Sequence, residues 1–211
     1  MTSLAKTTPL AALAAALVLA GCATTHKMAG TSDTEAPAAR PARHKAAETA
    51  AQAIGGAVID PQATIAANLA KAPNLTTLVK AIQAAGLDDS LAGAGPLTVF
   101  APTNEAFGRL APGTVDTLLK PENKGSLVKL LDYHVVSGRI TTRELRRRIA
   151  AGGGTATLTS MEGDPLTVTL TQNIITLTDG HGNKSYVQTG DIAQSNGIIQ
   201  VVNGVLIPNL G

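Results

Sequence analysis

Two hydrophobic periods divide the chain from Ile54 onward. Through residue 151, apolar side chains recur every three to four positions, which predicts a series of short amphipathic helices. After the glycines at 152–154, apolar side chains alternate with threonine instead. This second period predicts three strands, at residues 156–158, 166–170 and 175–177, with further strands at 184–187 and 198–202. A helical first part followed by a strand-rich second part is typical of an α+β domain.

Polar residues and glycines mark where these elements begin and end. Asn74, Thr103, Ser126 and Thr141 are expected to cap helix N-termini, with Glu144 completing a capping box with Thr141. Gly86 is expected to end a helix. Turns are predicted at 161–165 and 179–183, and a hairpin through Asn203-Gly204.

The first 22 residues have the pattern of an export signal. Lys6 precedes an apolar run at 9–20 that is too short to span a bilayer comfortably, and small residues follow it. The last four residues, Leu-Ala-Gly-Cys, resemble the bacterial lipobox. By that resemblance Cys22 becomes the first residue of the mature protein and carries acyl chains, which anchor the protein in a lipid bilayer.

The next segment, residues 23–57, is rich in alanine, threonine and proline and has no apolar period. Such a composition buries too little surface to offset the entropy of ordering, so we expect a flexible tether. A single folded domain is then expected at 58–211. Together these segments describe an exported protein that is anchored by lipid in the cell envelope or at the cell surface.

Composition excludes several classes of partner and site. The chain has no tryptophan, two tyrosines, two phenylalanines and a formal net charge of +2, so nucleic-acid binding is not expected. Cys22 is the single cysteine, which excludes an intramolecular disulfide and any multi-cysteine metal site. Four arginines between 143 and 148 either form a solvated helix face or meet an anionic surface.

Catalytic chemistry has no recognisable motif in this chain. A catalytic site needs a nucleophile, a base and a group that orients the base, yet the two histidines of the expected domain, His134 and His181, lie in no known catalytic or metal-binding pattern. The prediction is therefore a non-enzymatic protein without a cofactor or metal.

Three stretches resemble signature motifs of the fasciclin (FAS1) domain, and they occur in the order typical of that family. They are residues 98–107 (TVFAPTNEAF), 132–136 (DYHVV) and 196–208 (NGIIQVVNGVLIP). The motif positions, which we expect to be mainly structural, are Thr98, Val99, Phe100, Ala101, Pro102, Thr103, Asn104, Phe107, Asn196, Gly197, Gln200 and Val201.

The resemblance implies a β-sandwich or wedge decorated by several short helices. It also implies that Tyr133 and His134 contact a receptor during cell adhesion, as the Tyr-His pair of the family is thought to do. The alternative from the sequence is a core role, because His134 falls on the helix face of Leu127, Leu130 and Leu131. Where the family commonly has histidine, this chain has Gln200, which cannot become charged.

The functional prediction is a surface-exposed adhesion or interaction module whose partner is a surface or matrix protein or an envelope polymer. Two alternatives stay open at this point. One is a small-ligand-binding or enzyme-accessory domain with a pocket where helices meet the sheet, and the other is a structural envelope component. An apolar pocket with convergent polar groups would favour the ligand-binding alternative.

Overall fold

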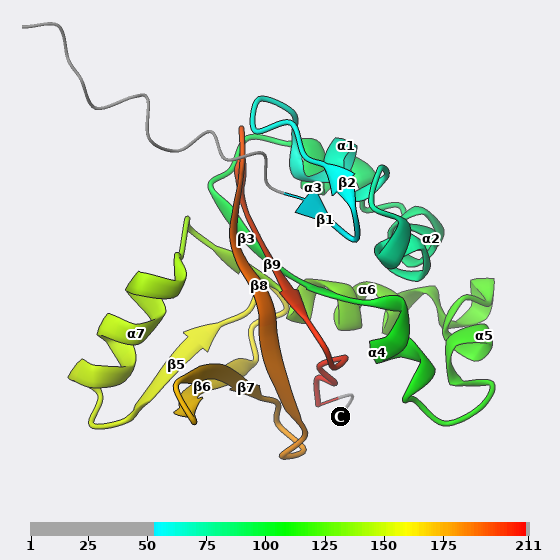
Figure 1. The fold of residues 1–211 in the computed structure, drawn as a ribbon. Helices are drawn as coiled ribbons and strands as arrows, with labels where there is room; N and C mark the ends of the chain where they lie inside the picture. The colour runs from blue at the N-terminus through cyan, green and yellow to red at the C-terminus, as the bar shows by residue number, and fades with distance from the viewer. Residues whose placement is uncertain (1–52, 210–211) are drawn as a thin grey trace, which may run out of the picture. The chain divides into compact units, whose positions relative to one another are not determined.

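The computed structural model describes residues 53–209, and Figure 1 shows their arrangement. The predicted signal peptide, Cys22 and most of the predicted tether lie outside these residues. The helices are α1 (Ile65–Leu69), α2 (Thr76–Ala85), α3 (Asp88–Ala92), α4 (Asn104–Gly108), α5 (Thr114–Leu118), α6 (Lys124–Tyr133) and α7 (Thr142–Ala151), with 3-10 turns η1 (Pro73–Leu75) and η2 (Pro121–Asn123). The strands are β1 (Ala53–Ile54), β2 (Ala57–Val58), β3 (Leu97–Pro102), β4 (Val135–Ser137), β5 (Thr155–Thr159), β6 (Pro165–Thr171), β7 (Ile174–Thr178), β8 (Lys184–Gln194) and β9 (Gly197–Val202).

Seven strands form one sheet in the order β4-β3-β9-β8-β7-β6-β5. Strands β3 and β9 run parallel, and the other neighbours in the sheet are antiparallel. An isolated bridge between Val136 and Ser160 joins the region of β4 to the end of β5, so the sheet is nearly closed. Several short helices surround it, and the predicted α+β fold is confirmed.

The alternating threonines of the second half form β5, β6 and β7 as predicted. In β5, for example, Ala156 and Leu158 are buried while the three threonines that alternate with them are exposed. Two residues depart from the alternation: Leu170, at the end of β6 beside the turn, is 39% exposed, and Thr176 of β7 is fully buried. The strand predicted at 184–187 is the beginning of a longer strand, β8, whose pairing with β9 shifts register twice.

Strands β3 and β9 are buried on both faces, which explains their continuous apolar sequences. Val99 and Ala101 of β3 face a core beneath the helices, and Ile199 of β9 belongs to the same core. Phe100, on the opposite face of β3, belongs to a second core that α7 covers. In Figure 1, α7 lies on one side of these central strands, and α1, α2, α4 and α5 lie on the other.

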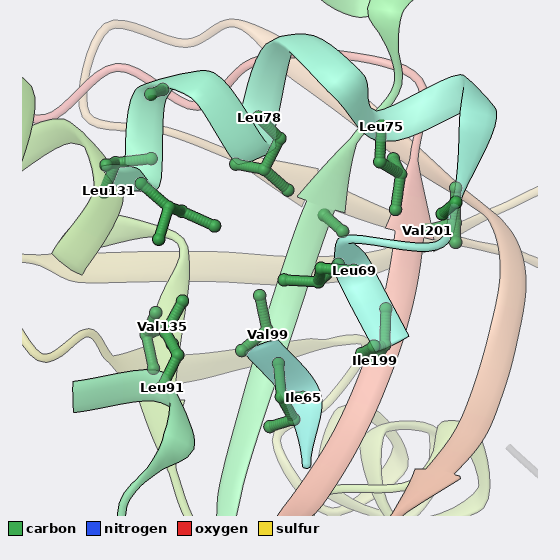
Figure 2. Close-up of a cluster of buried hydrophobic side chains, with 14 of the residues drawn as sticks. Ile65, Leu69, Leu75, Leu78, Leu91, Val99, Leu131, Val135, Ile199 and Val201 are labelled. Atoms are coloured by element: carbon green, nitrogen blue, oxygen red, sulfur yellow. The ribbon is translucent and has the colours of Figure 1, made fainter. Parts of the chain in front are cut away.

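Figure 2 shows the first of these cores, in which side chains from α1, α2, α3, β3, α6 and β9 meet. Ile54, from the short hairpin of β1 and β2, is 1% exposed and belongs to the same core. The core therefore includes a residue that precedes the expected domain start at 58.

Two of the predicted helix caps are wrong. Residues 73–75 form a 3-10 turn, and α2 begins at Thr76 without a side-chain cap from its own N-cap residue, so Asn74 does not cap it. Ser126 lies inside α6, which begins two residues earlier. In both places a proline-led 3-10 turn runs directly into the helix, since proline is tolerated in a first turn.

Two other predicted helix ends are confirmed, and of the predicted capping box only the Thr141 cap is confirmed. Gly86 ends α2 in the left-handed conformation, and Thr103 caps α4 by accepting a hydrogen bond from the backbone N–H of Ala106. Thr141 likewise accepts from the N–H of Glu144 at 3.1 Å. The Glu144 carboxylate, however, bonds Arg147 and Arg148 instead of completing the capping box.

The predicted hairpin at Asn203-Gly204 is also wrong. Residues 205–209 follow β9 without forming a strand, and β9 pairs with β8 through the turn at Ser195-Asn196. The Asn203 side chain accepts a hydrogen bond from the Tyr186 N–H at 2.8 Å, so this polar pair serves a long-range contact rather than a tight turn.

Candidate functional site

Thr98, the first residue of the opening motif, is fully buried and ties β3 to the chain that follows β4. Its hydroxyl donates to the Gly138 carbonyl at 2.6 Å and accepts from the Ile140 N–H at 2.9 Å. One side chain thus satisfies two backbone groups at the entrance to α7. This hydroxyl therefore has a structural role.

Asn104 supplies the cap that the sequence had assigned to Asn74. Its side-chain oxygen accepts from the Thr77 N–H at 2.9 Å, and its amide donates to the Pro73 carbonyl at 3.1 Å. These contacts hold the start of α4 against the start of α2, which is separated from it by 27 residues. A cap from another helix leaves no local signal, so sequence analysis missed it.

Tyr133 and His134 are both buried, with 0% and 1% of their surfaces exposed. The Tyr133 hydroxyl donates to the Pro165 carbonyl at 3.0 Å. His134 Nδ1 donates to the Leu130 carbonyl at 2.8 Å, and His134 Nε2 accepts from the Leu206 N–H at 3.0 Å. The neutral imidazole therefore bridges the end of α6 and the segment after β9.

Burial dominates the titration of both side chains. It lowers the pKa of His134 to about 4, because the charged ring would lose its hydration. Burial also raises the pKa of Tyr133 to about 12, and nearby carboxylates add to this. Both side chains are buried, and His134 also lines the narrow pocket described below. The geometry therefore fits the core role that the sequence left open and presents neither residue on an exposed surface.

Asn196 and Gly197 organise the end of the molecule at the β8–β9 turn. The Asn196 side chain accepts from the Ile65 N–H at 2.9 Å and donates to the carbonyls of Leu91 and Gly93 at 2.8 and 2.9 Å. At Gly197 an added Cβ would lie 2.1 Å from the Leu97 carbonyl oxygen, so only glycine fits. This motif therefore joins α1, α3, β3 and β9.

Gln200, which replaces the histidine common in the family, lies in a buried polar cluster. Its amide donates to the Ile140 carbonyl at 3.2 Å and to Asp191 Oδ1 at 3.0 Å, and its oxygen accepts from the Asp191 N–H at 3.1 Å. Asp191 also accepts from the Thr142 N–H at 2.7 Å, which connects β8 to the start of α7. The donors and acceptor of Gln200 are thus used inside the fold.

Asp179 is a structural residue, and the sequence did not reveal which backbone groups its carboxylate bonds. Its carboxylate accepts from the N–H groups of His181 and Asn183, both at 2.9 Å, and so shapes the predicted turn at 179–183. It also accepts from the Ile207 N–H at 3.0 Å. With His134, it fixes the extended segment at 203–209 against the domain.

Two hollows in the described domain bear on the ligand-binding alternative. A narrow pocket of about 30 Å³ lies among α2, α3, α6 and β3, far below the 300–1,000 Å³ typical of a drug-sized ligand. A wider hollow of about 500 Å³ lies beside Ser195 and Asn196, but exposed small residues at 92–96 line much of it. Neither encloses a small molecule in an apolar cavity with convergent polar groups.

Within 53–209, no helix has the length and apolar character needed to cross a bilayer. In the same part of the chain, no group of three or more histidine, cysteine, aspartate and glutamate side chains is arranged to hold a metal ion.

Several known proteins are similar to this chain in sequence. The chain is 39% identical over 155 residues to protein sll1483 of Synechocystis, an alignment that covers 74% of this chain and 79% of that protein. It is 32% identical over 165 residues to immunogenic protein MPB70 of Mycobacterium bovis, covering 76% and 75%. Pig transforming growth factor-beta-induced protein ig-h3 is 39% identical over 136 residues, which are 62% of this chain but 17% of that protein.

Among solved structures, the fold is similar to a FAS1 domain pair from the insect cell adhesion molecule Fasciclin I. The TM-score is 0.60 at 18% identity, and the match covers 71% of this chain and 51% of that one. The model of the Fasciclin domain family matches residues 73–208, which contain the motif residues described above. The chain belongs to the fasciclin domain family.

Proposed function

We propose that this chain is a non-enzymatic interaction module that works outside the cytoplasm, anchored to the envelope by lipid on Cys22. The observation that carries the proposal is the state of His134. Both ring nitrogens are engaged with backbone groups, to Leu130 and Leu206, and the ring is buried. The side chain most suited to catalysis is therefore occupied as a structural bridge.

General acid–base catalysis by His134 would require a ring that can take up a proton near neutral pH. The pKa of His134 is about 4, and its acceptor nitrogen is already bonded. Thr98 and Gln200 from the motifs are also used inside the fold. These motif side chains hold segments of the domain together, which leaves recognition to the surface.

The relatives support an interaction role. The structure with a similar fold comes from a cell adhesion molecule, and the relatives in animals carry the matched region as a small part of longer proteins. The proposed partner is a surface or matrix protein or an envelope polymer. The small size of the apolar pocket makes the small-ligand alternative the weaker one, and no specific observation favours a purely structural component.

The test is a binding assay with the chain from residue 23 onward, which contains every described element. Fluorescently labelled protein is incubated with the envelope fraction of its own cells, and retention is measured with increasing unlabelled protein. We expect saturable retention that the unlabelled protein displaces. Retention that rises linearly and resists displacement would contradict a specific interaction function.

A matched variant checks that the buried pair acts through the fold. Tyr133→Phe removes one buried hydroxyl and its bond to Pro165 but changes no surface. If the variant retains wild-type envelope binding at a temperature where it stays folded, the Tyr-His pair is structural. If the folded variant lost binding, Tyr133 and His134 would have to be assigned a direct contact with the partner.

A further inference from the structure

The narrow pocket combines an apolar interior with an exposed edge. Its walls include Leu78, Leu91, Val99, Leu131 and Val135, which come from five different elements and are labelled in Figure 2. A water-sized group needs about 10–15 Å³ on this scale. The volume of about 30 Å³ therefore accepts about two such groups, the size of the tip of one aliphatic side chain.

Met161 also lines this pocket and is 50% exposed, so it lies where the pocket meets solvent. Its backbone N–H donates to the Val135 carbonyl at 2.8 Å, which holds this turn against β4. Methionine is a flexible, polarizable side chain that adapts to varied apolar partners. The edge of the pocket is therefore suited to close over an inserted side chain.

Two carboxylates belong to residues that line the pocket or directly follow a residue that lines it. Asp132 is half-buried in its wall, and Glu162 directly follows Met161. Burial raises the pKa of Asp132, and the neighbouring Glu162 carboxylate raises it further. Glu162 Oε2 is buried without a hydrogen-bond partner in the described part of the chain.

No lysine or arginine among residues 53–209 forms an ion pair with either carboxylate, since the ion pairs found there both involve Glu144. A pair of partly desolvated like charges is unfavourable for the domain alone. A cation placed between them would offset this cost, so the charge pattern is complementary to a basic group beside the apolar pocket.

Resting on the interaction function proposed above, we propose that this pocket recognises a peptide segment of a partner protein bearing an aliphatic side chain and, two residues away, a lysine or arginine. In an extended segment, residues at i and i+2 point to the same side. The aliphatic tip enters the pocket under Met161, and the cation lies between Asp132 and Glu162.

The probe is the synthetic peptide acetyl-Gly-Lys-Gly-Leu-Gly-amide, titrated into 15N-labelled protein from residue 23 onward. Amide shifts of Leu87, Ser90 and Leu91, which line the pocket, report binding there. We expect saturating shifts confined to this region. Replacing the peptide lysine by glutamate, or its leucine by serine, should weaken binding by about tenfold or more.

On the protein, the Asp132→Asn and Glu162→Gln double variant should also weaken peptide binding by about tenfold. Its thermal midpoint should not fall, because the change removes two like charges without a cationic partner. Glu122→Gln is the matched control, since Glu122 is exposed before the opposite end of α6. It should leave the affinity unchanged.

The proposal is overturned if the lysine and glutamate peptides bind equally or if shifts scatter over the surface. Pocket shifts that grow with protein concentration alone would assign the pocket to a second copy of the chain and also overturn it. The envelope assay separates the two proposals. If the double variant keeps full saturable retention, the interaction function stands and the pocket assignment fails, whereas absent wild-type retention overturns the function itself.

Discussion

Acidification should destabilise this domain through His134 by an amount that the structure allows us to estimate. The ring is neutral in the folded protein, where burial lowers its pKa from 6.5 to about 4. In the unfolded chain the ring takes up a proton near its ordinary pKa. Between these two values the unfolded state therefore binds one more proton than the folded state.

The direction and size of the effect follow from this difference. The contribution of His134 to stability is fully present above pH 6.5 and is lost as pH falls toward 4. Each pH unit across this window costs about 1.4 kcal/mol, so the full loss is roughly 3 kcal/mol. Charging the ring also removes the acceptor for the Leu206 N–H, so the segment at 203–209 should loosen early.

The assay is urea unfolding followed by circular dichroism at pH 7, 6, 5 and 4.5, since the chain has no tryptophan for fluorescence. His134→Gln removes the titrating ring and serves as the reference for every other group that titrates in this range. We expect the wild type to lose stability more steeply than the variant. The difference between the two slopes gives the contribution of the His134 imidazole to the pH dependence of stability.

His181→Gln is the matched control, because it removes the other histidine of the described domain, whose ring is exposed. It should keep the steep pH dependence of the wild type. If the wild type and His134→Gln instead lose stability in parallel between pH 6.5 and 4.5, the argument from the buried neutral ring is refuted.

Two other changes test the remaining claims. Asn196→Asp keeps the shape of the side chain but places a carboxylate oxygen against the carbonyls of Leu91 and Gly93, so it should lower the free energy of unfolding by about 2 kcal/mol. Asn173→Asp, at an exposed turn, should cost little in the same urea titration, and an equal loss in both would contradict the role of the β8–β9 turn. Cys22→Ala should move the protein from the membrane to the soluble fraction, and unchanged fractionation would remove the lipid anchor.

Local patterns predicted the elements well. Alternating threonine gave β5 to β7, and the Thr103 and Gly86 ends were found because their signals lie within one helical turn. The burial of His134 also followed from its helical spacing with the leucines. Each of these depends on residues close together in sequence.

Long-range polar contacts were not predictable in the same way. Asn104 caps a helix that begins 28 residues earlier in the chain, and Asn203 bonds β8 instead of forming a hairpin. His134 finds its donor 72 residues away at Leu206. An asparagine or histidine that bonds a distant backbone group looks the same in sequence as one that caps its own helix.

The long-range polar contacts of the motif residues bear on the fold of this protein more than on its choice of partner. Thr98, Asn104 and Asn196 each join backbone segments that are far apart in sequence, so a chain that carries these motifs is constrained to this fold whatever it binds. Met161, which lines the pocket, and Glu162, which follows it in sequence, lie outside the three motifs. Because most motif side chains are bonded or packed inside the domain, differences in partner must arise from positions such as these. The family resemblance therefore predicts how the chain folds, and the chemistry of its partner has to be deduced from the residues around the pocket, of which Asp132 lies in a motif and Met161 and Glu162 do not.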